Sequence, residues 1–289
     1  MSTVRALIIS MRPKQWTKNL VVFAPLIFSH ELAEPGRFLA AAAAFASLCL
    51  VSGAVYLLND VIDAERDRVH AKKCRRPIAR GDLSEAAALS SGAVAAVGGL
   101  AIAFVVAPEV FASVLAYLAL QVAYTLWLKH WVLLDAFSIS GGFVLRATAG
   151  AYAVGTSLSP WLYAAVSLLA LFLAFGKRRH ELLLLDTEAV AHRPALEQYS
   201  PQLLDALLSS VTAATVVTYS MYSFSSQTAQ AAPGLMYTVP FVMFGLFRYL
   251  YLIYSRNMGG NPEEILLTDW PLIAAILLWL AASVAALYV

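Results

Sequence analysis

Charged residues are scarce in this chain. Only 13% of its 289 residues are Asp, Glu, Lys or Arg, whereas an ordinary soluble domain carries about 25%. Hydrophobic residues make up 60% of the chain, and the mean hydropathy is +0.71. This composition excludes an ordinary soluble domain and indicates an integral membrane protein.

Cysteine is nearly absent as well. Cys49 lies in an apolar run and Cys74 in a basic stretch, so the sequence offers neither a disulfide framework nor a zinc site. We also expect no cleavable secretion signal, because the first residues are amphipathic and lead directly into Arg12 and Lys14. We expect a membrane partner and no nucleic-acid partner.

Long apolar runs are what the chain has in abundance. About nine of them have a length that can cross the hydrocarbon core. We therefore predict an all-α polytopic membrane protein, with about nine transmembrane helices bundled around a central cavity open to the cytoplasmic side. Residues 1–289 are expected to form a single domain. The sequence does not decide between a monomer and a homo-oligomer. The predicted spans are 19–33, 37–58, 85–106, 109–128, 134–154, 159–176, 203–225, 234–254 and 270–288.

The basic residues predict the orientation of these spans. With the N-terminus inside, all Lys and Arg residues except Arg37 and Arg146 fall in segments on one side of the membrane. Cytoplasmic loops carry such an excess of positive charge. We therefore expect a plasma-membrane protein whose N-terminus and active site are cytoplasmic.

An acidic motif follows the second predicted span. On a helix, Asp60, Asp63 and Asp67 fall at i, i+3 and i+7, and Asn59 borders the same face. Three carboxylates this close repel each other unless a cation lies among them. Hard carboxylate and amide oxygens favour Mg²⁺, which completes its coordination shell with water and substrate phosphate. We predict that these residues hold Mg²⁺ and that the three acids are catalytic.

Basic residues lie directly downstream of the acids. They suit phosphate oxygens, and the candidates for substrate binding are Lys72, Arg75, Arg76 and Arg80. The alternative is a solvated loop whose positive charges only set the topology. Near the N-terminus, Lys14, Lys18 and Asn19 could reach an anionic substrate, or could simply anchor the chain at the headgroup level together with Trp16.

The fifth predicted span carries polar groups inside the membrane. Asp135, Gly142 and Arg146 fall on one helical face, and Lys129 precedes them. An intramembrane arginine is costly and faces a cavity or a partner rather than lipid. We predict that Arg146 binds a lipid phosphate, with Asp135 and Lys129 also at the substrate site. The alternative for Arg146 is a structural contact that ties helices together.

The sixth predicted span ends in a basic turn that contains Lys177, Arg178 and Arg179, all candidates for phosphate binding. The chain resembles the UbiA-type intramembrane prenyltransferase superfamily over nearly its whole length. The resemblance rests on the Asn-Asp-x-x-Asp-x-x-x-Asp motif at 59–67, on Arg76-Pro77 and on the number of apolar runs. It implies that Asn59, Asp60, Asp63 and Asp67 bind a Mg²⁺-diphosphate.

One departure from the superfamily narrows the expected substrate. Typical members carry a second Asp-rich motif where this chain has the basic segment 176–181. That segment, the opening segment 12–19 and the run 142–150 look like the decaprenyl-phosphate phosphoribosyltransferase branch. The resemblance implies transfer of 5-phosphoribose from phosphoribosyl diphosphate to a polyprenyl phosphate.

Two other functions compete with this interpretation. A prenyltransferase would move a prenyl group from a prenyl diphosphate to an aromatic or other acceptor, but it would be expected to keep the second acidic motif. A transporter would also place polar groups inside helices. It would not need a stripe of three carboxylates at the surface, and the sequence shows no evident inverted repeat.

Overall fold

The structure is a computed structural model, and it describes residues 2–29, 31–69, 73–185, 194–256, 258–260 and 262–288. Its elements in this part of the chain are helical. In chain order they are α1 (Thr3–Ser10), η1 (Pro13–Phe23), α2 (Ala24–Phe28), α3 (Pro35–Ile62), α4 (Ala64–Val69), η2 (Lys73–Arg75), α5 (Pro77–Arg80), α6 (Glu85–Val106), α7 (Pro108–Leu126), η3 (Leu128–His130), α8 (Leu134–Ala153), α9 (Pro160–Leu185), η4 (Pro194–Gln198), α10 (Pro201–Ser225), α11 (Gln227–Ala231), η5 (Pro233–Thr238), α12 (Val239–Arg256), α13 (Pro262–Thr268) and α14 (Trp270–Tyr288).

The all-α fold class and the integral membrane location are confirmed. Among the described residues, seven helical stretches are long and apolar enough to cross a membrane: Pro35–Ile62, Glu85–Val106, Pro108–Leu126, Pro160–Leu183, Pro201–Ser225, Pro233–Arg256 and Trp270–Tyr288. The predicted span 134–154 forms the 20-residue helix α8, which carries Asp135 and Arg146 and is not one of the seven. The count of nine spans and the orientation of the cavity stay predictions.

The prediction of one continuous α-helix over residues 19–33 is wrong. Residues 13–23 form the long 3₁₀ segment η1, and only Ala24–Phe28 are α-helical. The α-helix α8 comes so close to η1 that a Cβ on Gly150 would lie 2.1 Å from the carbonyl oxygen of Val22. Only glycine allows this backbone-to-backbone contact.

The chain divides into two compact units, each with its own core. Unit 1 comprises Met1–Leu26, Glu31–Leu128 and Leu145–Ser157; unit 2 comprises Ile27–His30, Lys129–Val144 and Leu158–Val289. The helix α8 therefore contributes its first half to unit 2 and its second half to unit 1. That residues 1–289 act as one domain stays a prediction.

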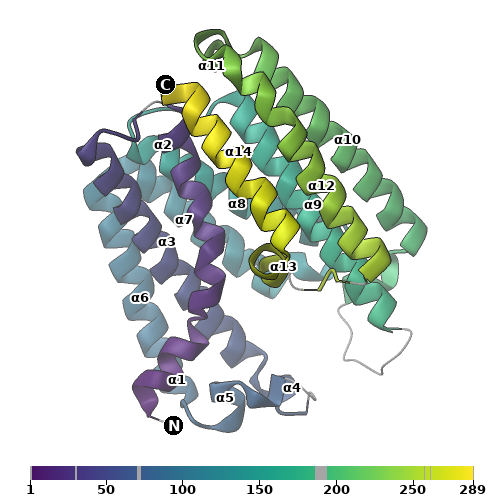
Figure 1. Cartoon of the computed structure of the whole chain (residues 1–289). Helices are drawn as coiled ribbons and strands as arrows, with labels where there is room; N and C mark the ends of the chain where they lie inside the picture. Colours follow the sequence, from purple (N-terminus) through teal and green to yellow (C-terminus); the bar gives the residue numbers. More distant parts are fainter. Residues whose placement is uncertain are drawn as a thin grey trace. The chain divides into compact units, whose positions relative to one another are not determined.

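Unit 1 is built around α3, which packs against α6 and α7 (Figure 1). Leu48 and Val51 of α3 are buried together with Ala103 of α6 and Val114 of α7. The helix α6 has the bounds of the predicted span 85–106, and the Ser84 hydroxyl caps its start by accepting a hydrogen bond from the Ala87 amide. The short helices α1, α4 and α5 pack together near the C-terminal end of α3.

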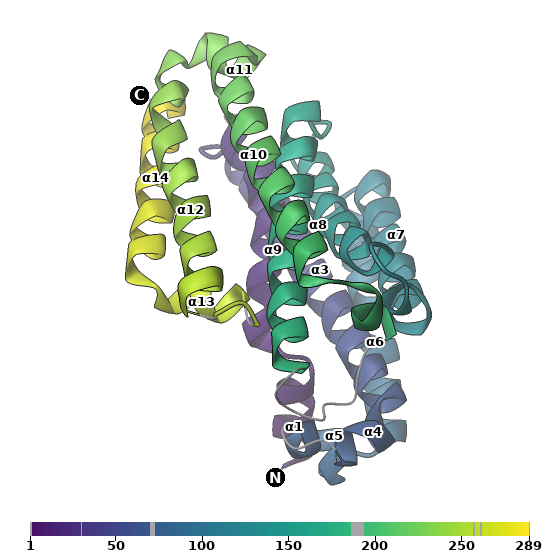
Figure 2. The ribbon, with the colours of Figure 1, turned by 90° about the vertical axis from the view of Figure 1, so that its right-hand side faces the viewer.

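Unit 2 contains two helix pairs, α9 with α10 and α12 with α14 (Figure 2). Phe172 and Phe175 of α9 are buried in one cluster with Leu204 of α10 and Tyr249 of α12. The predicted end of the sixth span is wrong, because α9 continues to Leu185. Lys177, Arg178 and Arg179 therefore lie on a helix rather than in a turn.

Candidate active site

The acidic motif lies where α3 ends and α4 begins, in unit 1. Asp60 is on the last turn of α3, and Asp67 is on α4. The predicted continuous helix is interrupted at Asp63, whose φ of −90° and ψ of 1° end α3. Asp60 and Asp67 are nevertheless both buried, each with 2% exposure. Asp63 is half-buried, and its Oδ2 accepts a hydrogen bond of 3.1 Å from the Asn59 amide.

Two arginines supply the cations that the clustered acids require. The Nη1 atom of Arg76 lies 3.1 Å from Asp60 Oδ1 and 2.5 Å from Asp67 Oδ2. Arg12 also forms an ion pair with Asp60, and its guanidinium lies over the Tyr56 ring at 4.8 Å. The repulsion expected among the carboxylates is thus offset by two positive charges.

The acid pair has the chemistry of a site for a hard cation. A single positive group, the Arg76 Nη1 atom, already lies between two carboxylate oxygens, and such oxygens are the ligands that Mg²⁺ prefers. However, no group of three or more His, Cys, Asp or Glu side chains that could hold a metal occurs among the described residues. Asp60 and Asp67 are therefore the core of the candidate metal site, and a substrate phosphate and water would have to complete the coordination.

The other predicted phosphate-binding residues have different exposures. Lys14, Arg75 and Arg80 are exposed, and Lys18, Lys129 and Lys177 are half-buried. Arg80 forms a 3.3 Å ion pair with Asp82. Lys72 lies outside the residues that the structure describes.

Arg146 lies inside unit 1 and binds protein groups. Its Nε donates a 2.7 Å hydrogen bond to Asn19 Oδ1, and its Nη2 donates one of 2.7 Å to the Tyr117 hydroxyl. Its guanidinium also lies over the Tyr117 ring at 4.4 Å. Arg146 is 5% exposed and Asn19 is 1% exposed. These contacts match the structural alternative for Arg146, and they place the Asn19 side chain in the protein interior.

Asp135, the other polar residue of α8, has partners within unit 2. Its Oδ2 is 2.5 Å from Arg178 Nε, and its Oδ1 accepts a 2.8 Å hydrogen bond from the Tyr199 hydroxyl. Arg178, which is 1% exposed, also forms an ion pair with Glu181. Asp135 and Arg146 share a helix, as predicted, but each has its own set of partners.

Tyr199 holds the start of α8 in place. Its hydroxyl accepts a 2.8 Å hydrogen bond from the Leu133 amide, and Leu133 has a φ of +67°, which is unusual for a residue other than glycine. Burial raises the pKa of Tyr199 above its ordinary value, and the hydrogen bond to Asp135 raises the pKa further. The phenol therefore stays protonated at neutral pH and keeps donating to Asp135.

Arg179 is also paired. Its Nε is 2.6 Å from Asp205 Oδ1, and its guanidinium lies over the Tyr254 ring at 4.0 Å. The Tyr254 hydroxyl donates to the same Asp205 oxygen at 2.7 Å. Two of the three bases predicted to bind phosphate at 177–179 are thus already bound to carboxylates.

Replacing Arg178 by methionine should destabilise the protein strongly. The change leaves the buried Asp135 without its cation, and breaking a buried pair in this way costs about 3–5 kcal/mol. The matched control is Arg179→Met on the same helix, whose partner Asp205 is 41% exposed, so we expect about 1 kcal/mol or less. Thermal unfolding in detergent measures both. Equal losses for the two variants would contradict the buried role of Arg178.

Three residues that these contacts single out were not among the predicted site residues: Arg12, Tyr117 and Tyr199. Arg12 stands in the opening Arg12-Pro13-Lys14 segment, so a signal for it was present. Tyr117 and Tyr199 had no such signal, because their partners are 29 and 64 residues away in the chain.

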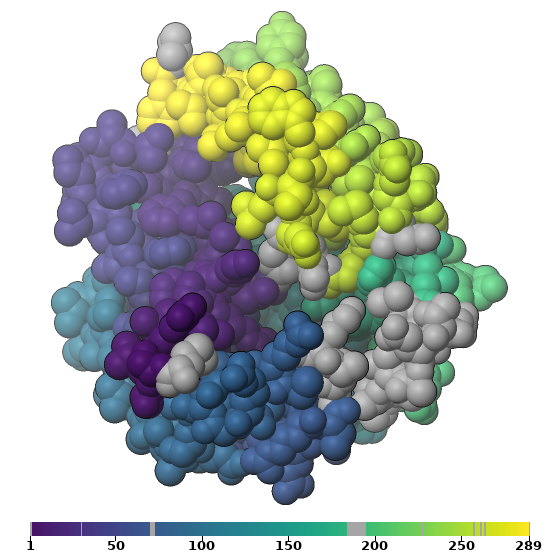
Figure 3. Space-filling model, turned by 60° about the horizontal axis from the view of Figure 1, so that its bottom comes forward, coloured from purple at the N-terminus to yellow at the C-terminus, as the bar shows by residue number. Residues whose placement is uncertain are grey.

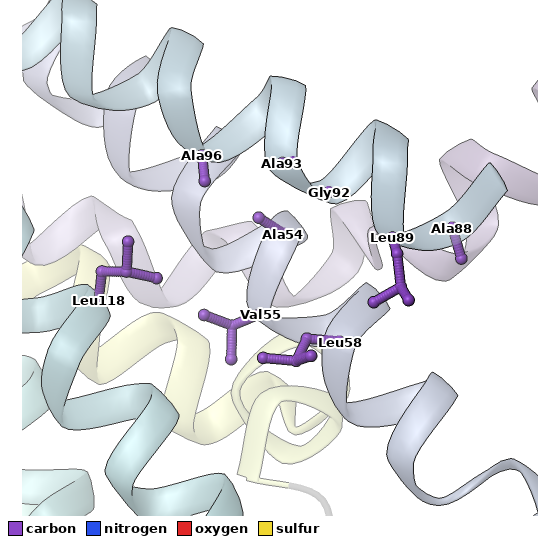
Figure 4. Close-up of a pocket in the computed structure, with 9 residues that line it drawn as sticks. All are labelled: Ala54, Val55, Leu58, Ala88, Leu89, Gly92, Ala93, Ala96 and Leu118. Carbon is purple, nitrogen blue, oxygen red and sulfur yellow. The ribbon is translucent and has the colours of Figure 1, made fainter. Parts of the chain in front are cut away.

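A small apolar recess in unit 1 lies apart from this chemistry. It is lined by α3, α6 and Leu118 of α7, and the labelled side chains carry only carbon atoms (Figure 4). With no charged or hydrogen-bonding side chain in its lining, it offers nothing that could bind a phosphate. The candidate active site is therefore the acid pair with its arginines.

The sequence matches known proteins over nearly its whole length. Residues 21–263 match the UbiA prenyltransferase family. A decaprenyl-phosphate phosphoribosyltransferase from Mycolicibacterium smegmatis is 34% identical over 299 residues, which cover 99% of this chain and 93% of the relative. Another protein of that name, from Corynebacterium glutamicum, is 34% identical over 97% of this chain and 86% of its own length.

Solved structures share the fold. A UbiA homologue from Archaeoglobus fulgidus bound to GPP and Mg²⁺ superimposes with a TM-score of 0.75 at 18% identity, covering 98% of this chain and 100% of that chain. The same homologue bound to DMAPP and Mg²⁺ gives a TM-score of 0.76 and covers 98% of this chain and 99% of that chain, again at 18% identity. These likenesses establish the fold, and the solved relatives hold a divalent metal.

Proposed function

The chain belongs to the UbiA prenyltransferase family, and from this premise we propose that it transfers 5-phosphoribose from phosphoribosyl diphosphate to a polyprenyl phosphate such as decaprenyl phosphate. The observation that carries this proposal is the near full-length similarity to two bacterial decaprenyl-phosphate phosphoribosyltransferases. The apolar helices suit an enzyme whose acceptor is a lipid. The distribution of basic residues supports a plasma-membrane location with the acids on the cytoplasmic side. A homo-oligomer stays a prediction.

In the proposed reaction, an oxygen of the acceptor phosphate forms a bond to the ribose C1 atom while the bond from C1 to the diphosphate breaks. Positive charge develops on the ribose ring, as in glycosyl transfer generally, and negative charge develops on the departing diphosphate. The acceptor phosphate is already anionic, so no side chain has to remove a proton from it. The protein has to orient the two substrates and to stabilise the leaving group.

The acid pair provides the proposed place for the leaving group. Asp60 and Asp67, with Asn59 and Asp63 beside them, would hold Mg²⁺, which supplies charge stabilisation to the diphosphate. Arg76 already lies on both acids and carries the forked guanidinium that suits phosphate. Lys14, Lys18, Arg75 and Arg80 are further proposed contacts for anionic substrate groups.

The basic segment of α9 was predicted from the sequence to bind a second phosphate of the donor. Because Arg178 and Arg179 are ion-paired to carboxylates, we propose neither of them as a phosphate ligand. The role of Lys177 in phosphate binding stays a prediction. Arg178 instead joins α8 to α9 through Asp135. Lys129 keeps its proposed role in phosphate binding.

The direct test is a transfer assay with the purified protein in detergent. Labelled phosphoribosyl diphosphate and decaprenyl phosphate should give a labelled lipid product in the presence of Mg²⁺, and EDTA should abolish the product. The control donor is a labelled prenyl diphosphate with an aromatic acceptor. If the protein consumed the prenyl diphosphate and ignored the phosphoribosyl donor, it would be a prenyltransferase, the coarser function that the family name supports.

A further inference from the structure

We propose that Arg12 is a donor-binding residue, and that Arg12 and Arg76 move from the acid pair to the donor's diphosphate, so that the metal and the diphosphate bind together rather than separately. This inference rests on the proposed function of the acid pair. It assigns a task to Arg12, which has none in the proposed reaction above.

The two acids are more deeply buried than the two arginines that pair with them. Asp60 and Asp67 are inside the protein, whereas the side chains of Arg12 and Arg76 are 28% and 25% exposed. The arginines therefore form the outer layer over the acids. Figure 3 shows the face on which the N-terminal residues, in purple, lie beside the blue residues of α4 and α5. An anion that arrives from solvent meets the guanidinium groups first.

The charges explain why a metal alone would bind weakly. The two carboxylates and the two guanidinium groups already balance each other. A divalent cation would have to displace the two guanidinium groups from the carboxylates. The cation and the displaced guanidinium groups would then lie close together, and their positive charges would repel each other. A diphosphate removes this obstacle, because it accepts hydrogen bonds from both arginines as they leave the acids.

The backbone at Arg12 supports a special role for this residue. Its φ of 54° and ψ of 64° place it in the left-handed region at the junction of α1 and η1. Residues other than glycine rarely adopt this conformation, and those that do are concentrated at functional sites. The Tyr56 ring, 4.8 Å from the guanidinium, gives the side chain a contact that does not depend on Asp60.

Equilibrium dialysis of radioactive Mn²⁺ against the purified full-length chain tests the proposal without measuring turnover. The dialysis is done with Mn²⁺ alone and with added pyrophosphate. The wild type should bind Mn²⁺ at least about tenfold more tightly when pyrophosphate is present. Arg76→Met should bind Mn²⁺ alone about tenfold more tightly than the wild type and should lose most of the pyrophosphate effect, and Arg12→Met should change in the same direction. Arg68→Met is the matched control, because Arg68 of α4 is exposed and pairs with Glu85 instead of the acids, and it should match the wild type.

The outcomes separate this inference from the proposed function. Equal Mn²⁺ affinity with and without pyrophosphate in the wild type would overturn the inference and leave the acid pair as the metal site. The inference is also overturned if Arg12→Met and Arg68→Met behave alike. Asp67→Asn should bind no Mn²⁺ in either condition; if it bound as well as the wild type, the proposed metal site itself would be wrong. If Arg76→Met does not fold, the inference is still tested by Arg12→Met and by Mn²⁺ binding to the wild type with and without pyrophosphate.

Discussion

Replacing Asp67 by asparagine should reduce phosphoribosyl transfer by about 10³-fold or more. Asparagine keeps the size of the side chain but removes the negative charge that faces Arg76. Without the Asp67 carboxylate, Arg76 and the proposed Mg²⁺ would no longer be held where they can stabilise the negative charge of the leaving diphosphate. Asp60→Asn should have a comparable effect, because Asp60 shares the same guanidinium. Initial rates at saturating donor, measured on protein that elutes as a single folded species, check both.

Two other acids provide the controls for this prediction. Glu65 lies on α4 with Asp67 but is exposed, so Glu65→Gln should retain normal rates. Asp63 is half-buried and paired with Asn59, so Asp63→Asn should lose activity, but less than the two buried acids. Full Mg²⁺-dependent activity in all of the Asp60, Asp63 and Asp67 variants would remove the motif from the active site.

Arg146→Met should lower the thermal stability more than it lowers the turnover of the protein that remains folded. The change leaves the buried side chains of Asn19 and Tyr117 without their partner, and each unsatisfied group costs about 1–3 kcal/mol. Arg146→Lys should recover part of the loss, because an ammonium group can donate to one of the two oxygens but cannot reproduce the fork. Melting in detergent and transfer rate are measured on the same preparations.

Tyr117→Phe is the matched variant for this prediction. It removes only the hydroxyl and leaves the bond from Arg146 to Asn19, so it should cost about 1 kcal/mol. The double variant Arg146→Met/Tyr117→Phe should lose less stability than the sum of the losses of the two single variants, because Arg146→Met already removes the hydrogen bond to the Tyr117 hydroxyl. A stable Arg146→Met protein whose kcat fell about 10²-fold would instead support a role for Arg146 in binding the lipid phosphate.

Arg146 also supports the segment η1. Asn19, its partner, lies in the segment that carries Lys14 and Lys18, and Gly150 brings the backbone of α8 against the same segment at Val22. A 3₁₀ segment of 11 residues is unusually long, so it depends on these contacts. We therefore expect the folded fraction of Arg146→Met to show a higher KM for the donor.

The local features of the protein could be predicted from the sequence alone. The scarcity of charge and the long apolar runs indicated a membrane protein of helices, and the predicted span 85–106 has the bounds of α6. The spacing of the acids placed Asp60 and Asp67 together, and the structure has both on one arginine. These features depend on composition and on neighbours within a turn or two of helix, which a sequence displays directly.

The partners of the buried charges were decided by tertiary packing. Arg12 pairs with an acid 48 residues away, Arg178 with one 43 residues away, and Arg146 binds an amide 127 residues away. Helical periodicity shows which residues share a face, but not which other element covers that face. For this reason Arg146 and Arg178 both looked like phosphate ligands in the sequence, and the packing of η1 against α8 and of α8 against α9 gave each of them a partner inside the protein. A charge in an apolar interior has to be compensated, and only the folded chain shows whether the compensating group is a substrate or another side chain.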